Sequence, residues 1–321
     1  MPDRGLSDKA WSCVSCGGAL VAVLVDVHDT RFGVVGRFDI AGCASCGLEQ
    51  TRPRPTPDQL TALYEEHYNF GGSRDESRYG RLRQAFLTSA AYRLFLAIDG
   101  DVSFHGVAAA RPGVRLLDYG CNEGRGLELY RANGFAVEGL EPNRVAAERA
   151  RARGFTVHNA GLAEFRPREP YDVVVLSNVL EHALDPGEML AQVGRLLAPG
   201  GEAWVSCPNG ESWLRRLFGR AWINWHVPFH VVHFSRATLE RALDESGFAV
   251  TDARQATPAL WVAQSVIAAL FARPGRPTRQ MRSPFLVVGL MLLARGLCFP
   301  LLWLANRLGR GDCLVYRARK A

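Results

Sequence analysis

The 321-residue sequence predicts an α/β protein with a doubly wound, seven-stranded sheet, a small metal-binding segment before it and a helical insertion near its end. Three observations lead to this prediction. Apolar runs alternate with amphipathic segments over residues 111–255, two Cys-x-x-Cys pairs lie near the N-terminus, and two apolar stretches occur within residues 256–310. Alternating strands and helices are typical of a parallel sheet covered on both faces.

The composition is that of an ordinary globular protein. Hydrophobic residues make up 48% of the chain and charged residues 22%, with a formal net charge of +6 and a pI near 9.0. This mildly basic balance is compatible with anionic small molecules, lipid headgroups or RNA and selects none of them. The first residues contain no apolar run, so we expect no secretory signal and a cytoplasmic protein with reduced thiols.

Four of the eight cysteines form two Cys-x-x-Cys pairs. Cys13 and Cys16 are separated by 26 residues from Cys43 and Cys46, and glycine follows each pair. Such pairs present two thiolates each to one tetrahedral Zn²⁺. The stretch between them alternates enough to form short strands but is too small to form a core without metal. We therefore predict a structural zinc ribbon over residues 1–55, with no catalytic role for the ion.

The next elements are predicted in order along the chain. Three prolines in residues 51–59 indicate a linker, and residues 56–110 are expected to form a helical lead-in that closes over a cofactor. Six strands are expected at residues 114–120, 135–143, 155–160, 171–179, 202–209 and 248–255, with helices at 124–134, 144–154, 187–201 and 235–247. Residues 311–321 alternate like a last edge strand of this sheet, which makes residues 256–310 an insertion.

A glycine-rich turn over residues 116–126, LLDYGCNEGRG, follows the first of these strands. Its glycines are spaced G-x-x-x-G-x-G, whereas a dinucleotide fingerprint requires G-x-G-x-x-G, and Asn122 stands in place of the second glycine. A P-loop is excluded because no Gly-Lys-Ser/Thr follows. Gly120 and Gly124 allow the backbone to approach a ligand. Glu141, which ends the next strand, can accept hydrogen bonds from two ribose hydroxyls.

Together with its neighbours, this turn resembles the motifs of the class I S-adenosylmethionine-dependent methyltransferases. LLDYGCNEGRG is similar to their first motif, VEGLEPN to the second, YDVVVLSNVLEHALDP to the fourth-strand segment of the small-molecule branch, and LLAPGGEAWVSCPN to the Pro-Gly-Gly turn and fifth strand. The matches occur in the family's order over about residues 111–210. The resemblance implies a Rossmann-like methyltransferase sheet over residues 111–255 and S-adenosylmethionine as cofactor. It is strongest to members with an N-terminal four-cysteine zinc segment.

The resemblance also implies where the cofactor lies. It places Asp118 near the methionine end, and Leu162 and Ala163 near the adenine. Asn122 is tolerated because a methionine moiety replaces the pyrophosphate. The alternatives are a loop-capping role for Asp118 and a solvated strand end for Glu141. The predicted cofactor-binding residues are Asp118, Gly120, Asn122, Gly124, Glu141, Leu162, Ala163 and Asn178.

The acceptor is expected at the carboxyl ends of the fourth and fifth strands, where Asn178, Glu181, His182, Cys207, Pro208 and Asn209 lie. Methyl transfer is an in-line displacement, so placement dominates, and a base matters only for an acidic nucleophile. Residues 220–235 contain two tryptophans and three histidines, which favour an acceptor pocket with one base. The alternatives are a packed loop and a metal site, and no carboxylate or cysteine lies at ligand spacing for a metal. The predicted bases are His230, His226 and His182, and the predicted acceptor contacts are Tyr64, Tyr68, Asn209 and Trp225.

Residues 256–310 contain two apolar stretches around a joint in which Arg273, Arg276, Arg279 and Arg282 recur. The second stretch approaches membrane-spanning length but is interrupted by Arg295, Gly296 and Pro300. If the last residues rejoin the sheet, the chain returns to the side it left, so a single span is excluded. We expect either a helical pair on the membrane face with its arginines at anionic headgroups, or a hydrophobic lid or homodimer interface.

The sequence thus predicts a methyltransferase acting on a small-molecule, sugar or lipid-linked acceptor. The membrane interpretation adds peripheral contact with the inner face of the membrane through residues 259–308. A competing hypothesis is an RNA methyltransferase whose ribbon binds nucleic acid. It is disfavoured because the ribbon charges nearly balance and no Asn-Pro-Pro-aromatic segment follows the fourth strand. A non-catalytic cofactor-binding scaffold ranks third, and a nicotinamide reductase ranks last.

Overall fold

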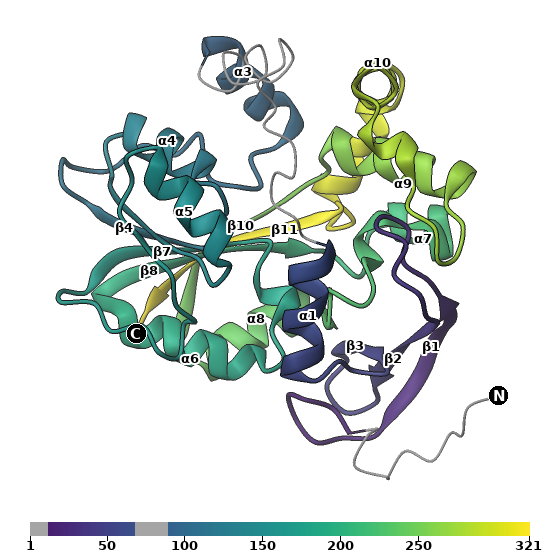
Figure 1. Cartoon of the computed structure of the whole chain (residues 1–321), viewed down its shortest axis with the longest axis horizontal. Helices are drawn as coiled ribbons and strands as arrows, with labels where there is room; N and C mark the ends of the chain where they lie inside the picture. Colours follow the sequence, from purple (N-terminus) through teal and green to yellow (C-terminus); the bar gives the residue numbers. More distant parts are fainter. Residues whose placement is uncertain (1–11, 68–88) are drawn as a thin grey trace.

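The computed structural model describes residues 12–67 and 89–321, with the backbone alone for residues 90–93. These residues form a four-stranded sheet of order β1-β2-β3-β9 and a seven-stranded sheet of order β10-β11-β8-β7-β4-β5-β6 (Figure 1). The predicted α/β class and the seven-stranded sheet are therefore confirmed.

The larger sheet has a parallel centre. Its parallel strands are β4 (Arg115–Tyr119), β5 (Ala136–Leu140), β6 (Val157–His158), β7 (Tyr171–Ser177) and β8 (Leu197–Pro208). Helices α4 (Arg125–Ala132) and α5 (Arg144–Ala152) lie on one face, and α6 (Pro186–Leu196) and α8 (Arg236–Glu245) lie on the other (Figure 1). Residues 173–176 of β7 are all buried, as expected for a strand covered on both faces.

The last strand corrects one prediction. β11 (Cys313–Lys320) lies between β8 and β10 (Phe248–Ala256), antiparallel to both, so residues 311–321 do not form the edge of the sheet. The alternating polar residues of this segment led to the prediction of an edge strand. They are in fact long arginine side chains that cover neighbouring groups. Arg317 stacks over the ring of Trp204, and Arg319 forms an ion pair with Glu202.

The ribbon is joined to the second half of the chain. β1 (Leu20–Val27), β2 (Phe38–Cys43) and β3 (Glu49–Arg52) form an antiparallel sheet, and β3 pairs with β9 (Val232–His233). The Thr51 hydroxyl donates to the His230 carbonyl at 2.6 Å. Helices α1 (Pro57–His67) and α3 (Ala90–Asp99) belong to the lead-in. The ribbon thus contacts the segment that carries the predicted histidines.

Short helices connect the strands near that segment: η2 (Leu180–His182), α7 (Trp213–Phe218), η3 (Gly219–Ala221) and η4 (Ile223–Trp225). The last three of these helices are anchored by Asp312, which is fully buried and accepts hydrogen bonds from Ser212, Trp222 and Asn224. Because a buried carboxylate is costly unless it is hydrogen-bonded, these three donors fix the 212–224 segment against the start of β11.

The predicted insertion is a helical pair, α9 (Ala259–Phe271) and α10 (Pro284–Arg307), joined through η5 (Arg279–Arg282). In the described part of the chain, α10 is the one helix with the length and apolar composition to cross a membrane. Both ends of the pair lead into the larger sheet, and its connecting loop is also attached, since Thr278 bonds the carbonyls of Thr30 and Arg31. The pair is therefore attached to the rest of the protein at both ends and at its loop, and Figure 1 shows α9 and α10 next to each other at the upper right.

The charge in the middle of α10 is neutralised by the protein. The Arg295 guanidinium donates to the Asp99 carboxylate and to the backbone carbonyls of Asp99 and Thr257. Asp99 is buried and also accepts a hydrogen bond from the backbone N–H of Ala259, at the start of α9. One ion pair thus attaches both helices of the insertion to the lead-in helix α3.

The Arg295→Leu variant is expected to lose about 3–5 kcal/mol of unfolding free energy, because it leaves the Asp99 carboxylate buried and unpaired. Urea unfolding followed by circular dichroism measures this change. The matched control is Arg282→Leu at an exposed position just before α10, which should stay within about 0.5 kcal/mol of wild type. Equal stability of the two variants would contradict the anchoring role.

Candidate active site

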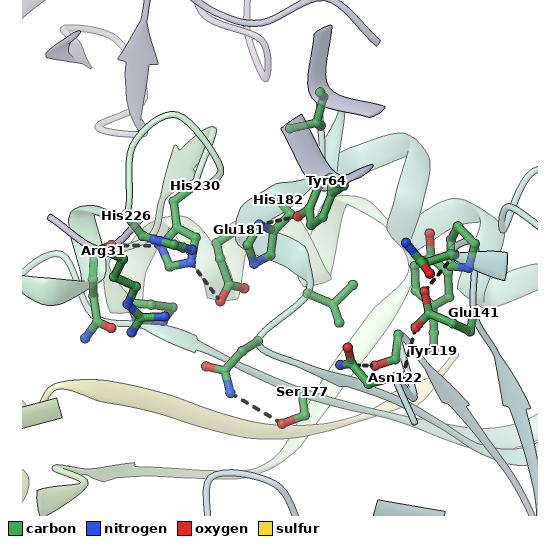
Figure 2. Close-up of a pocket in the computed structure, with 18 of the residues that line it drawn as sticks. Arg31, Tyr64, Tyr119, Asn122, Glu141, Ser177, Glu181, His182, His226 and His230 are labelled. Atoms are coloured by element: carbon green, nitrogen blue, oxygen red, sulfur yellow. Dashed lines mark hydrogen bonds and ion pairs between the residues drawn. The ribbon is translucent and has the colours of Figure 1, made fainter. Parts of the chain in front are cut away.

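A cavity of about 650 Å³ lies at the carboxyl ends of β4, β5 and β7 (Figure 2). Gly120, Asn122 and Glu141 line one end, and Glu181, His182, His226 and His230 line the other. Part of the predicted cofactor set and the three predicted catalytic histidines therefore line a single cavity, with the turn after β7 between them.

The backbone conformation of the glycine-rich turn explains the unusual spacing of its glycines. Gly120 and Gly124 have φ values of 76° and 75°, in the left-handed region that glycine adopts without strain. Asn122 has a φ of 51°, and asparagine is among the few other residues that enter this region readily. A Cβ on Gly124 would lie 3.0 Å from the Cβ of Ala150, so this glycine also permits close packing of α5.

Glu141 is held by the turn that it faces. Its two carboxylate oxygens accept the backbone N–H groups of Asn122 at 2.9 Å and Asn143 at 2.8 Å. The side chain is buried, which raises its pKa, and it still lines the cavity. Each oxygen keeps a lone pair for a further donor, so the arrangement fits a ribose diol. The turn and this carboxylate together fit S-adenosylmethionine.

Asp118 lies behind the turn and does not line the cavity. Burial and the neighbouring Glu141 raise its pKa to about 7. A Cβ on Gly126 would lie 3.3 Å from the Asp118 carboxylate and 3.1 Å from the His105 ring, so Gly126 leaves the room that these two side chains occupy. The predicted place of Asp118 beside the methionine end stays a prediction.

Affinity for the cationic cofactor is expected to rise between pH 6 and pH 7 and then to level off. Below its pKa of about 7 Asp118 is protonated, and a bound sulfonium and ammonium favour the charged carboxylate, so binding must release a proton. Isothermal titration calorimetry with S-adenosylmethionine at several pH values measures the slope. The Asp118→Asn variant should bind more weakly, with a flat profile. A wild-type profile that is flat would remove Asp118 from the cofactor site.

Of the other predicted cofactor residues, one lines the cavity and three do not. Asn178 lines the cavity with a φ of 53°, and its side-chain oxygen is buried without a hydrogen-bond partner among the described residues. Gly124, Leu162 and Ala163 are not among the lining residues, and Leu162 belongs to the core. The adenine position assigned to residues 162 and 163 therefore stays a prediction.

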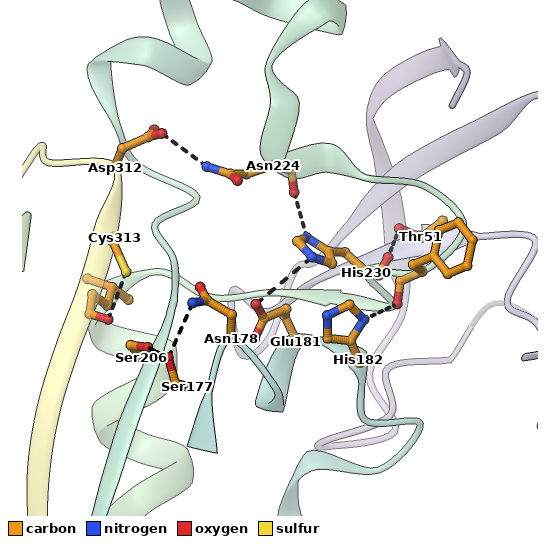
Figure 3. Close-up of polar contacts among 12 residues, drawn as sticks. Thr51, Ser177, Asn178, Glu181, His182, Ser206, Asn224, His230, Asp312 and Cys313 are labelled. Atoms are coloured by element: carbon orange, nitrogen blue, oxygen red, sulfur yellow. Dashed lines mark hydrogen bonds and ion pairs between the residues drawn. The ribbon is translucent and has the colours of Figure 1, made fainter. Parts of the chain in front are cut away.

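At the opposite end of the cavity a carboxyl group lies among imidazoles (Figure 3). Glu181 is 1% exposed, burial raises its pKa to about 8, and its carboxylate lies 3.9 Å from Nε2 of His230. Burial lowers the pKa of His182 to about 4 and those of His226 and His230 well below their usual range. All three histidines are therefore neutral, and a neutral imidazole can accept a proton.

Backbone carbonyls orient two of these rings. Nδ1 of His230 lies 2.8 Å from the Asn224 carbonyl. Nδ1 of His182 lies 2.9 Å from the Phe229 carbonyl and 2.7 Å from the Tyr64 hydroxyl. We assign the proton of each ring to Nδ1 from these acceptors, which leaves Nε2 with its lone pair. Tyr64 therefore lies in the cavity next to His182, and its predicted contact with the methyl acceptor stays a prediction.

Two residues expected to bind the acceptor belong to the core instead. Asn209 is fully buried, and its amide bonds Gln255 and the carbonyl of Gly311, which ties β8 to the start of β11. Trp225 is 2% exposed, donates to the Gly219 carbonyl and packs edge-on against Trp222. Neither residue lines the cavity. Tyr68 lies outside the described residues.

The cavity also has walls that the sequence did not predict. Arg31 comes from the ribbon and donates to Gln264 of α9 at 3.0 Å, and both residues line the acceptor end. Leu260 and Trp261 join them from the first turn of α9. No local sequence pattern predicts these contacts, because they depend on how the ribbon and the insertion pack against each other.

The four ribbon cysteines are brought together as predicted. The sulfur atoms of Cys13 and Cys46 are 3.4 Å apart, and so are those of Cys16 and Cys43. All four sulfur atoms lie within 4.8 Å of one another. A Cβ on Gly18 would lie 2.7 Å from the Ser45 hydroxyl and 3.1 Å from the Cys43 sulfur, so a side chain at this position would crowd the cluster. Four thiolates in this arrangement fit a tetrahedral Zn²⁺.

The sheet order and the cavity at its carboxyl edge define a Rossmann-like protein with a site for a nucleoside cofactor. Comparison with known families identifies it further. The model of the family described as "Methyltransferase domain" matches residues 79–253, which is more than half of the chain. This chain belongs to that methyltransferase family.

Curated relatives match over part of their length. A ubiquinone biosynthesis O-methyltransferase of Caulobacter sp. is 41% identical over 97 residues, which cover 28% of this chain and 38% of the relative. A probable S-adenosylmethionine-dependent methyltransferase of Mycolicibacterium smegmatis is 33% identical over 155 residues, covering 47% of this chain and 58% of the relative. The chain thus spans less than two thirds of either relative.

Among solved structures, a 1,6-didemethyltoxoflavin-N1-methyltransferase of Burkholderia thailandensis with bound S-adenosylhomocysteine is similar. It has 17% sequence identity and a TM-score of 0.47, and the match covers 88% of this chain and 96% of that one.

Proposed function

We propose that this chain is an S-adenosylmethionine-dependent methyltransferase that methylates a small-molecule acceptor with an apolar or lipid tail at a membrane surface. The observation that carries the proposal is the single cavity with Glu141 and the glycine-rich turn at one end and a buried cluster of histidines and a carboxyl at the other. The relatives named as O-methyltransferases favour an oxygen atom as the methyl acceptor.

The cofactor supplies a methyl group on a positively charged sulfur, which becomes a neutral thioether after transfer. This chain's residues then have two tasks. The turn at Gly120–Asn122 and the Glu141 carboxylate hold the nucleoside and methionine at one end of the cavity. The opposite end places the acceptor in line with the methyl group and excludes water, because its polar groups are buried.

The membrane part of the proposal rests on the outward face of α10. Its exposed apolar side chains include Phe285 at 91%, Leu292 at 69% and Leu297 at 74% exposure. Arg295 is turned inward to Asp99, so this face carries no charge between Pro284 and Asn306. An uncovered apolar face of this length is unusual for a surface in contact with water alone.

Cationic groups lie at one end of this face. The connecting loop between α9 and α10 carries four arginines: Arg273, Arg276, Arg279 and Arg282. Arginines beside an apolar surface helix favour binding to anionic headgroups. Since the loop is attached to the ribbon at Thr278, we infer that the helical pair lies in the plane of the interface. This surface supports a position at the inner face of the membrane.

The helical pair also reaches the cavity. Trp261 and Gln264 of α9 line the acceptor end, whereas Leu270 and Phe271 at the other end of α9 are exposed. An acceptor whose headgroup occupies the cavity can therefore extend its tail along α9 toward the apolar face. This path favours a lipid-linked acceptor over a fully polar one.

Vesicle flotation tests the membrane contact. The zinc-loaded wild-type protein should float with vesicles of phosphatidylcholine and anionic phosphatidylglycerol, and Leu292→Glu/Leu297→Glu should remain at the bottom. The control Val145→Glu/Val250→Glu changes two exposed apolar residues elsewhere and should float. Equal flotation of both double variants would contradict the proposal. Failure of the wild type to float, with concentration-dependent sedimentation, would assign the face to a dimer.

Acceptor assays test the chemistry. Catechols with and without a prenyl tail, presented in the same vesicles, should both yield S-adenosylhomocysteine, and the tailed compound should have the lower KM. Binding of S-adenosylmethionine without turnover of any phenol, catechol or amine in the set would favour a non-catalytic scaffold.

A further inference from the structure

Three side chains at the acceptor end of the cavity are arranged as metal ligands. Glu181 and His182 come from η2, which follows β7, and His230 comes from the segment before β9. Each offers one ligand atom, and these atoms lie within 4.8 Å of one another. In the part of the chain that the structure describes, the four ribbon cysteines are the other cluster with this property.

The separations fit an ion of ordinary size. Metal–ligand bonds of about 2.0–2.1 Å place two ligand atoms about 3.4 Å apart in a tetrahedral site and about 4.1 Å apart when they face each other. The distance from Nε2 of His230 to the Glu181 carboxylate is 3.9 Å, too long for a hydrogen bond but inside this range. A cation between them requires only small side-chain movements.

Both imidazoles are held in the form that binds metal. Nδ1 of His230 donates to the Asn224 carbonyl and Nδ1 of His182 donates to the Phe229 carbonyl, so both Nε2 lone pairs remain available. Metal-binding histidines usually donate their second N–H to a carbonyl or carboxylate in this way. Asn224 is itself fixed by Asp312, which makes the ring of His230 rigid.

Glu181 provides an independent indication. The side chain is 1% exposed, and neither carboxylate oxygen has a hydrogen-bond partner among the described residues. Burying such a group without a partner is costly, and buried carboxylates are normally paired or bound to a cation. The backbone carbonyl of Glu181 accepts the N–H of Val231 at 2.8 Å, so the carboxylate is held beside His230.

We propose that Glu181, His182 and His230 bind a divalent first-row transition-metal cation, and that a position open to the cavity takes an oxygen of the acceptor. The inference rests on the proposed function for the identity of the acceptor, but the cation site itself does not. Two imidazoles and one carboxylate suit Zn²⁺, Fe²⁺, Co²⁺ or Mn²⁺ better than Mg²⁺ or Ca²⁺. The site is separate from the ribbon, whose four thiolates leave no open position.

Titration of Co²⁺ into the zinc-loaded wild-type protein tests the site. One equivalent should bind and give visible d–d bands without the near-ultraviolet thiolate-to-cobalt band that marks exchange into the ribbon. Glu181→Gln and His230→Gln should weaken Co²⁺ binding by at least about 100-fold, more than the 10–100-fold typical of groups behind the ligands. His226→Gln is the matched control, because it lines the same cavity outside the ligand set, and it should bind Co²⁺ like wild type.

The outcomes separate this inference from the proposed function. Zinc content and circular dichroism show whether each variant is folded. If a variant does not fold, the presence or absence of the d–d bands in the wild-type spectrum alone shows whether the cation site exists. Absence of the d–d bands in wild type, or wild-type Co²⁺ affinity in Glu181→Gln, overturns the cation site. Should S-adenosylmethionine and acceptor still react in that protein, the proposed function stands and Glu181 with His230 is assigned to proton transfer. Failure to bind S-adenosylmethionine overturns the proposed function whatever the Co²⁺ result.

Discussion

Replacing Cys43 with serine is expected to abolish methyl transfer while leaving the binding of S-adenosylmethionine nearly unchanged. A structural Zn²⁺ supplies about 10–16 kcal/mol of apparent binding free energy to a small domain, so loss of one ligand should unfold the ribbon. The ribbon supports the acceptor end of the cavity through Thr51, which bonds both the His230 carbonyl and the His233 ring. The cofactor end is formed by β4 and β5, in the other sheet.

Calorimetry with S-adenosylhomocysteine, metal analysis and a turnover assay on the same sample measure the three quantities. Cys298→Ser is the control, because Cys298 is exposed on α10 and outside the cluster, and it should keep its zinc and activity. Full turnover in a zinc-free Cys43→Ser protein would show that the ribbon does not position the site. Loss of cofactor binding as well would show that the two sheets unfold together.

Replacing Glu141 with alanine is expected to weaken cofactor binding by at least about 100-fold, equivalent to about 3 kcal/mol. The carboxylate accepts the backbone N–H groups of Asn122 and Asn143, so its removal leaves two buried donors without partners and loosens the glycine-rich turn. It also removes the proposed acceptor for the ribose hydroxyls. Turnover at limiting cofactor should fall in proportion.

A graded series of variants shows whether the lost affinity comes from the hydrogen-bond acceptors of Glu141. Glu141→Gln retains one carbonyl oxygen but turns an NH₂ group toward a backbone N–H, so its affinity should lie between those of wild type and Glu141→Ala. Glu138→Ala, on the strand that leads to Glu141, removes a carboxylate that pairs with Arg115 and His158 outside the cavity, and it should bind the cofactor normally. Affinity of Glu141→Ala within about threefold of wild type would place the nucleoside elsewhere, since about 0.6 kcal/mol is less than one hydrogen bond to a charged group.

Features that depend on neighbouring residues could be predicted from the sequence. The Cys-x-x-Cys pairs, the glycine-rich turn and the alternation of strands and helices each specify local geometry, and all three appear in the structure. The position of β11 could not be predicted, because period-two alternation says nothing about which strands lie beside it. Its arginines cover aromatic and acidic neighbours that the sequence does not reveal.

Prediction from the sequence is limited in the same way at the acceptor end of the cavity. Residues 220–235 are rich in aromatic side chains and histidines, and this composition suits a pocket wall and a packed core equally well. The structure assigns Trp225 to the core and His230 to the cavity, because Asp312 binds the first half of the segment and β3 pairs with the second. Residues 220–235 contain no acidic metal ligand, and only the fold brings the Glu181 carboxylate beside His230.

Because Ala256 pairs with Cys313 in adjacent antiparallel strands, the helical pair occupies a hairpin connection of 56 residues, 257–312. The entropy of closing such a connection grows only with the logarithm of its length, so extending a four-residue turn to this size costs about 2 kcal/mol. The helices bring their own buried contacts to offset that cost. This junction is therefore a natural grafting point, at which a lineage can gain or exchange a helical module while the register of the larger sheet stays the same.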